Sequence, residues 1–131
     1  MFASLFVLLY IGHLLADYPF QTDHQAAHKA GCGREGWTAN VAHAATHVAT
    51  CAIALTIGAV ALNDVTLSAP VAFGALVWIG ATHAFIDRRW PVQWWMNRTG
   101  QASWAANGGA VHVDQTAHIA ALVVAALCLS A

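Results

Sequence analysis

Eight histidine and aspartate residues of this chain form four pairs, and within each pair the two residues are four positions apart. The pairs are His13 and Asp17, His43 and His47, His83 and Asp87, and Asp114 and His118. On an α-helix this spacing brings both side chains to one face, one turn apart. Imidazole and carboxylate groups are common ligands of divalent transition metals. The four pairs therefore predict four helices that direct metal ligands toward a common centre.

The ligand set indicates which metals such a centre would take. Five imidazoles and three carboxylates exceed the three or four protein ligands of one zinc ion, but they match a dinuclear centre between facing helices of a bundle. Repulsion among Asp17, Asp87 and Asp114 would be relieved by a cation between them. The donor atoms suit Zn, Fe or Mn better than Cu(I), which prefers sulfur, or Ca²⁺, which prefers oxygen alone. We expect one or two divalent transition metal ions as cofactors.

The pairs lie in apolar segments that resemble membrane helices. Of 131 residues, 59% are hydrophobic and only 8% are charged, against about 25% charged in soluble domains. A transmembrane helix needs about 20 mainly apolar residues. The sequence predicts an all-α fold, an integral membrane four-helix up-down bundle in a single domain over residues 1–131. The predicted helices span about 2–17, 40–62, 70–87 and 113–130, with connections 18–39 and 88–112.

The position of each pair along its helix also favours one centre. The first and third pairs lie at the C-terminal ends of their predicted helices, and the second and fourth lie at the N-terminal ends. Because consecutive helices of an up-down bundle run in opposite directions, these four ends lie on one side of the membrane. Ionisable side chains in spanning segments are costly to insert and mark function by default. We expect all eight ligands at one level near one membrane surface.

The basic residues predict the orientation in the membrane. All five lie in connections 18–39 and 88–112, and the loop near residues 63–69 has none. By the positive-inside rule both connections face the cytoplasm, and both termini lie on the other side of the inner, cytoplasmic membrane. Tryptophans in or beside the same connections would anchor in the lipid headgroups, and residues 88–96 are expected to lie in that interface. The basic residues are Lys29, Arg34, Arg88, Arg89 and Arg98.

Other features exclude several classes of protein. A net charge of −1 with five Lys and Arg leaves no basic surface for nucleic acid. Cys32, Cys51 and Cys128 lack the C-x-x-C spacing of disulfide or zinc frameworks. The first apolar run has no basic region before it and no small-residue cleavage site, so we expect a membrane helix and not a cleaved signal peptide. Small residues such as Ala44, Gly58 and Gly80 would allow close helix packing, in a monomer or a homo-oligomer.

Several ordered motifs carry a family resemblance. They are His13-Leu-Leu-Ala-Asp17, Gln21-Thr22-Asp23 with Lys29, His43-xxx-His47, His83-xxx-Asp87, and Asp114-Gln115-xx-His118. In this order they resemble a family of small bacterial and phage membrane proteins of unknown function, over nearly the whole chain. More distantly, the chain is similar to predicted membrane-bound metal-dependent hydrolases, which also carry His and Asp pairs on transmembrane helices. The resemblance implies a metal site within the membrane helices.

These observations favour a metal-dependent hydrolase that faces the cytoplasm, since a divalent metal lowers the pKa of bound water and polarises a scissile bond. Asp23, or a carboxylate that the metal does not fully engage, is the candidate general base. Arg88 and Arg89 could bind a phosphate or lipid headgroup, although anchoring by the positive-inside rule is their simpler role. The boundary position predicts an amphiphilic substrate, cleaved at a phosphoester or an ester.

Other interpretations remain open. Two irons in the same bundle would make a di-iron oxidoreductase, and the same residues could form a proton relay or a metal or proton carrier. Histidine and aspartate could also only cross-link the helices. His24 and His28 form a fifth pair near Asp23, which could cap a short helix. His24 and His28, together with His112, lie outside the apolar runs, so no role follows for them.

Overall fold

The computed structural model describes residues 1–131, and the chain forms helices joined by loops, with no strands. Four helices are long: α1 (Phe2–Asp17), α3 (Gly33–Ala61), α4 (Ala69–Ile86) and α7 (Ala110–Ser130). Three are short: α2 (Asp23–His28), α5 (Trp90–Arg98) and α6 (Ala102–Trp104). A kinked turn over Ala105–Gly109 joins α6 to α7.

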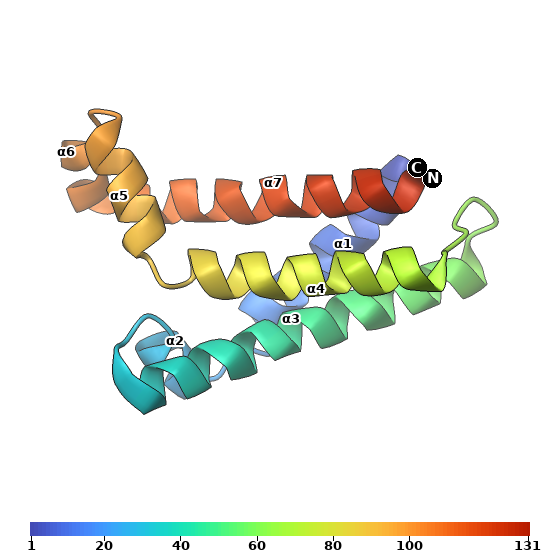
Figure 1. Cartoon of the computed structure of the whole chain (residues 1–131), viewed down its shortest axis with the longest axis horizontal. Helices are drawn as coiled ribbons and strands as arrows, with labels where there is room; N and C mark the ends of the chain where they lie inside the picture. The colour runs from blue at the N-terminus through green and yellow to red at the C-terminus, as the bar shows by residue number, and fades with distance from the viewer.

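Each long helix packs against two others. α1 contacts α3 and α7, and α4 contacts the same two helices from the other side. α3, α4 and α7 run along the length of the molecule, and both chain termini lie at one end (Figure 1). The short helices α2, α5 and α6 gather at the opposite end. The molecule therefore has a terminal end and a short-helix end.

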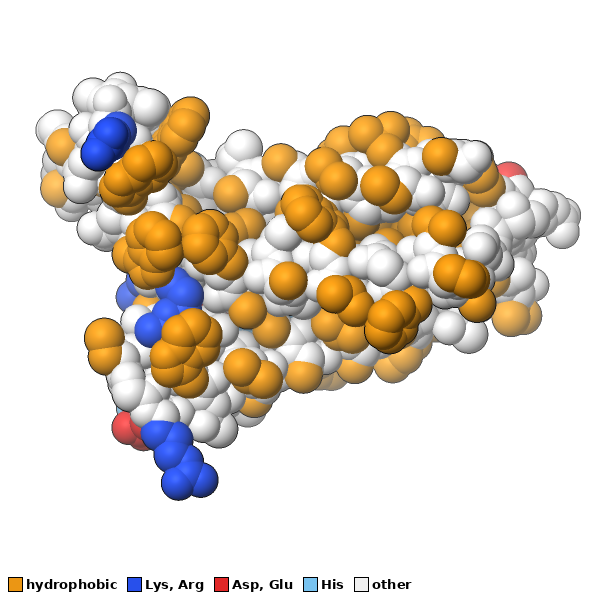
Figure 2. All heavy atoms as spheres, in the orientation of Figure 1, with side chains coloured by type: hydrophobic (Ala, Val, Ile, Leu, Met, Phe, Trp, Pro, Cys, Tyr) orange, Lys and Arg blue, Asp and Glu red, His pale blue; other side chains and the backbone are white.

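Three helical segments are long and apolar enough to cross a membrane, which suggests a membrane protein. They are α3, α4 and the continuous stretch Ala102–Ser130. α1 has 16 residues and is about 24 Å long at 1.5 Å per residue, somewhat less than the hydrocarbon core of about 30 Å. Hydrophobic side chains spread along the flank of the molecule, and Lys and Arg gather at the short-helix end (Figure 2). A lipid-facing surface would carry this distribution.

An apolar core fills the interior toward the terminal end. It joins side chains of α1, α3, α4 and α7, among them Leu5, Leu9, Leu55 and Leu122. α1 lies very close to α3 at Gly12, because a Cβ added there would lie 3.0 Å from the Cα of Cys51. Glycine thus permits a backbone approach that a larger residue would prevent.

Two helices begin differently from the sequence prediction. α3 starts at Gly33, seven residues before the predicted position 40, because hydropathy detects only the apolar part of a helix whose first turns are polar. α2 is capped by Thr22, whose hydroxyl accepts a hydrogen bond from the backbone N–H of Gln25 (3.2 Å) while the Gln25 side chain accepts from the Thr22 N–H (3.0 Å). Asp23 was a wrong choice of cap, since this reciprocal pair needs a hydroxyl and an amide three residues apart.

The turn between α4 and α5 contains an unusual backbone conformation. Arg89 has a φ of +62°, in the left-handed region that few residues other than glycine occupy. This residue turns the chain into α5, which forms within the segment 88–96 predicted for the membrane interface and continues to Arg98. Trp90, Trp94 and Trp95 of α5 are exposed. Such exposed rings are typical of the headgroup layer.

Candidate metal centre

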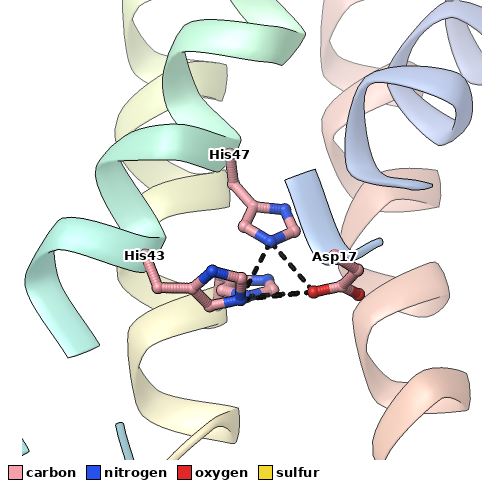
Figure 3. Close-up of side chains that lie close together, drawn as sticks. Asp17, His43 and His47 are labelled. Atoms are coloured by element: carbon pink, nitrogen blue, oxygen red, sulfur yellow. Dashed lines mark hydrogen bonds and ion pairs between the residues drawn. The ribbon is translucent and has the colours of Figure 1, made fainter. Parts of the chain in front are cut away.

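The ends of α1 and α3 bring one carboxylate and two imidazoles together. Asp17 is the last residue of α1, and His43 and His47 lie one turn apart on α3. The Oδ1 atom of Asp17 is 3.1 Å from Nε2 of His47 and 3.3 Å from Nε2 of His43, and these two nitrogens are 3.3 Å apart (Figure 3). The three atoms form a nearly regular triangle, and all three residues are buried.

His83 of α4 completes a group of four. Its Nε2 lies 4.0 Å from Oδ1 of Asp17, and the ligand atoms of Asp17, His43, His47 and His83 all lie within 4.8 Å of one another. Ligand atoms at 2.0–2.1 Å from a tetrahedral zinc ion are about 3.3–3.4 Å apart. The three edges among Asp17, His43 and His47 have nearly this length already, and the edge from Asp17 to His83 is longer, at 4.0 Å.

The neighbours of His43 cannot all be satisfied by hydrogen bonds. Its Nε2 faces the ammonium of Lys29 at 3.0 Å, which only donates, and the carboxylate of Asp17 at 3.3 Å, which only accepts. One imidazole nitrogen either donates or accepts, so it cannot serve both partners. Nε2 of His83 is also buried, and although Oδ2 of Asp87 lies 3.1 Å away, the two atoms lack the geometry of a hydrogen bond. A metal ion would bind the lone pairs of both nitrogens and the carboxylate oxygen of Asp17, while Lys29 keeps Asp87 as its partner. The residues present therefore fit a metal ion.

A second group adjoins the first and shares His83. Nε2 of His83 lies 3.1 Å from Oδ2 of Asp87, and Nε2 of His118 lies 4.0 Å from Oδ1 of Asp87. Asp87 follows the last residue of α4, and His118 comes from α7. The three residues are buried and close enough to hold an ion together. All four long helices thus contribute to two adjacent groups.

His13 lies beside these groups and not within one. Its Nε2 is 3.2 Å from Oδ2 of Asp17 and 3.4 Å from Oε1 of Gln115. Both neighbours are acceptors, so Nε2 carries the hydrogen and donates. Gln115 also donates to Oδ2 of Asp17 (3.3 Å). His13 and Gln115 together orient the carboxylate whose other oxygen faces His43 and His47.

Asp114 is likewise set apart. Its Oδ2 lies 3.4 Å from Nδ1 of His118, and about a fifth of its side chain is exposed (22%). It therefore contacts one member of the second group from outside. Of the eight predicted ligands, the structure gathers Asp17, His43, His47, His83, Asp87 and His118 into the two groups, with His13 and Asp114 next to them.

The two groups, with His13 and Asp114 next to them, form one buried cluster. Lys29 also belongs to this cluster, although residue spacing did not predict it. Its Nζ lies 3.0 Å from Oδ2 of Asp87, in addition to its contact with His43. It is the only lysine of the chain, and the positive-inside rule had accounted for it by membrane orientation alone. The one sequence feature that could have pointed to Lys29 is its place among the ordered motifs, after Gln21-Thr22-Asp23. Lys29 places a fixed positive charge next to Asp87.

A pocket of about 460 Å³ opens beside the second group. α2, α5 and the adjoining ends of α4 and α7 surround it, and its charged lining residues are Lys29, Asp87, Arg89 and Asp114. Val92 and Val111 add apolar surface. Because Asp87 belongs both to the pocket and to the second group, a molecule in the pocket would reach the buried cluster from the short-helix end.

The two arginines predicted to bind substrate have different surroundings. Arg89 is exposed and lines the pocket. Arg88 instead donates to the backbone carbonyls of Lys29 (3.2 Å) and Gly31 (2.8 Å) and lies over the Trp37 ring at 4.4 Å. Arg88 therefore fixes the turn between α2 and α3 and does not line the pocket.

The predicted general base, Asp23, is exposed at the start of α2. No hydrogen bond or ion pair joins it to the cluster, and it does not line the pocket. Asp23 follows Asp17 by six residues, but α2 turns its first residue outward. His112 is exposed as well, stacked on the ring of Trp104 with centroids 6.2 Å apart.

Comparison with known proteins identifies the family. The model of the family described as "Protein of unknown function (DUF3307)" matches residues 5–131. The chain belongs to this family. No curated protein and no solved structure matches it. The match spans every residue of the buried cluster of this chain, from His13 to His118. The family description gives no activity and no link to membrane-bound hydrolases.

Proposed function

We propose that this chain is an integral membrane, metal-dependent hydrolase whose His and Asp groups hold one or two divalent transition metal ions, Zn, Fe or Mn. The observation that carries the proposal is the triangle of Asp17, His43 and His47, with edges of 3.1–3.3 Å. Lys29 and Asp17 make opposite demands on Nε2 of His43, and a tetrahedral ion needs ligand atoms at about the spacing of this triangle. Metal binding is the first step of the proposal, and hydrolysis is the second.

The proposed setting is a four-helix up-down bundle of α1, α3, α4 and α7 in the inner membrane. The short-helix end would face the cytoplasm, since it carries the basic residues, and both termini would lie on the other side. The cluster would then lie just inside the cytoplasmic boundary, with the pocket open to the headgroup layer. Lipid is therefore the expected surrounding partner.

The pocket supports an amphiphilic anion as substrate. Lys29 and Arg89 supply two positive charges, and Val92 and Val111 supply apolar surface. Arg and Lys bind phosphate oxygens through charge-assisted hydrogen bonds. We therefore favour a phosphoester with an apolar chain, such as a phospholipid or an isoprenoid phosphate, over a neutral ester.

A bound divalent ion would supply Lewis-acid chemistry that activates water at neutral pH. The chain's own residues would do the rest. Lys29 and Arg89 would hold the phosphate group, and the burial of the cluster would exclude bulk water. Asp114 replaces Asp23 as the proposed proton acceptor, since it lines the pocket and lies outside both groups.

The test combines metal analysis with an activity measurement. The purified protein in detergent should contain at least about one equivalent of a transition metal, and it should release phosphate or a phosphorylated headgroup from a panel of lipid phosphoesters. His47→Ala should lose both properties, and His112→Ala, a change at an exposed histidine, should lose neither. Wild-type protein without metal would refute the centre. Metal-loaded protein that cleaves no lipid phosphoester or ester would refute hydrolysis and leave the centre standing.

One observation also favours a second candidate, a di-iron oxidoreductase. The two groups adjoin each other at His83, so two ions could lie side by side, with one of them taking Nε2 of His83, as in di-iron bundles. Two irons per chain with an optical spectrum that changes on reduction would favour oxidation over hydrolysis. A metal or proton carrier is less well supported, since the buried residues on the terminal side of the cluster are apolar apart from Thr50 and Cys51.

A further inference from the structure

A separate group of metal-ligating side chains lies at the surface of the short-helix end. His24 and His28 come from α2, and Glu35 comes from the first turn of α3. One ligand atom from each of the three lies within 4.8 Å of the others. Nε2 of His28 is 3.5 Å from Oε1 of Glu35, and the rings of His24 and His28 stack at 4.5 Å. This group shares no residue with the buried cluster.

The backbone prepares His28 for metal binding. Nδ1 of His28 lies 2.9 Å from the carbonyl oxygen of His24. A carbonyl only accepts, so Nδ1 carries the hydrogen. In the neutral ring, Nε2 then keeps its lone pair, and this atom faces Glu35. A hydrogen bond from one ring nitrogen to a backbone carbonyl is the usual support of a histidine that binds metal through the other nitrogen.

We propose that His24, His28 and Glu35 bind one zinc-class divalent ion at the aqueous surface. Two imidazoles and one carboxylate are a known set of three protein ligands for zinc, and the fourth position stays open to water. Exposure makes this surface site weaker than the buried one and freely accessible to ions in solution. The proposal does not depend on the proposed hydrolase function.

The surface site would be coupled to the buried cluster through Lys29. His28 is directly followed by Lys29, whose ammonium contacts Asp87 and His43. An ion bound by His28 of α2 and Glu35 of α3 would hold these two helices together. It would thereby keep Lys29 against Asp87, so the surface ion would stabilise one wall of the pocket.

Zinc titration tests the surface site. The protein is purified in detergent with a tag that contains no histidine, stripped of metal and titrated with Zn²⁺ by calorimetry. Wild type should bind one more equivalent than His24→Ala, His28→Ala or Glu35→Gln. His112→Ala, an exposed histidine outside the group, should match wild type. Glu35→Gln keeps the shape of the side chain, and His24→Ala leaves the hydrogen bond of His28 intact, so the result does not depend on one disruptive variant.

The buried cluster provides an internal comparison. His47→Ala should lose the buried equivalent and keep the surface one, so the two sites can fail separately. If the isotherms of His28→Ala and Glu35→Gln overlay that of wild type, His28 and Glu35 form only an ion pair, and the surface site is refuted. A surface equivalent that persists in His47→Ala supports the proposal even when no hydrolysis is found.

Discussion

The two halves of the helical interior are equally well buried but opposite in chemistry. Toward the terminal end, Leu5 and Leu9 have 0% exposure within an apolar core. Toward the short-helix end, His43 and His47 also have 0% exposure, yet they face Asp17. In lipid the apolar half is held by close packing, whereas buried ionisable groups are costly without partners. The first half can therefore provide a rigid frame, and the second can respond to a cation.

Gly12 lies at the boundary between these halves. It lets α1 approach α3 one residue before His13 and five residues before Asp17. The separation of α1 and α3 at this point controls how near Asp17 comes to His43 and His47. Packing in the apolar half thus sets the geometry of the polar half.

The largest expected effect is the loss of metal from the polar half. Asp17→Asn removes the anionic oxygen that faces three imidazoles, so metal content should fall at least about tenfold, by analogy with the cost of losing ligands or their supports. Leu9→Ala is the matched change in the apolar half. It should lower the free energy of unfolding by about 2 kcal/mol or more and leave the metal content near wild type. Elemental analysis and equilibrium unfolding in detergent measure the two effects, and equal metal loss in both variants would contradict the division.

A substitution at the boundary should affect both halves. Gly12→Val would push α1 away from α3, because its Cβ would lie 3.0 Å from backbone of Cys51. We expect weaker metal binding, by roughly tenfold, although no ligand is changed. Gly74→Val on α4 is the control, since a Cβ there meets nothing within 4 Å. Zinc titration of the two variants makes the comparison, and unaltered affinity in Gly12→Val would mean that the halves are independent.

Lys29→Met tests how the positive charge of Lys29 affects metal binding in the polar half. Removal of the ammonium takes away a positive charge 3.0 Å from Asp87, so a divalent ion at His83, Asp87 and His118 should bind about threefold to tenfold more tightly. Lys29→Arg keeps the charge and should stay close to wild type. Competition with a metal indicator measures the affinities. Weaker binding in Lys29→Met would indicate that Lys29 helps to assemble the second group and does not repel its ion.

The smallest expected effect lies in the loop at the terminal end. The pKa of Asp64 is lowered by the hydrogen bond from the Ser4 hydroxyl (2.6 Å) and by the N-terminal ammonium at 3.0 Å. A carboxyl with a lowered pKa in the folded state stabilises the fold above its ordinary pKa and loses this effect as the pH falls through the folded-state value. Asp64→Asn should lower Tm slightly at neutral pH, because exposed pairs contribute little. The difference should shrink as the pH falls through the lowered folded-state pKa of Asp64, as thermal unfolding over a series of acidic pH values would reveal.

Local patterns allowed the long helices and most of the cluster to be predicted. The residues of α1 were predicted as 2–17, and those of α4 within one residue at each end, because an apolar run with Asp near its end is visible in the sequence. The four-residue spacing identified His43, His47 and His83 because residues four positions apart lie on one face of a helix. Lys29 and Gln115 were missed, since their contacts depend on how α2 and α7 pack against distant elements. The position of Asp23 outside the cluster could not be predicted for the same reason, because its place in the sequence does not show which way α2 turns.

At Arg89, the residue type that would best stabilise the turn differs from the residue type that gives the pocket its positive charge. A residue with a side chain in that conformation costs roughly 1 kcal/mol or more, and glycine would adopt it freely. Arg89→Gly should therefore relax the turn while it removes a cation from the pocket lining. Selection of variants for a higher Tm alone would favour this change and remove one of the two basic side chains that line the pocket. The sequence that makes this turn most stable is therefore not the sequence that binds an anion best.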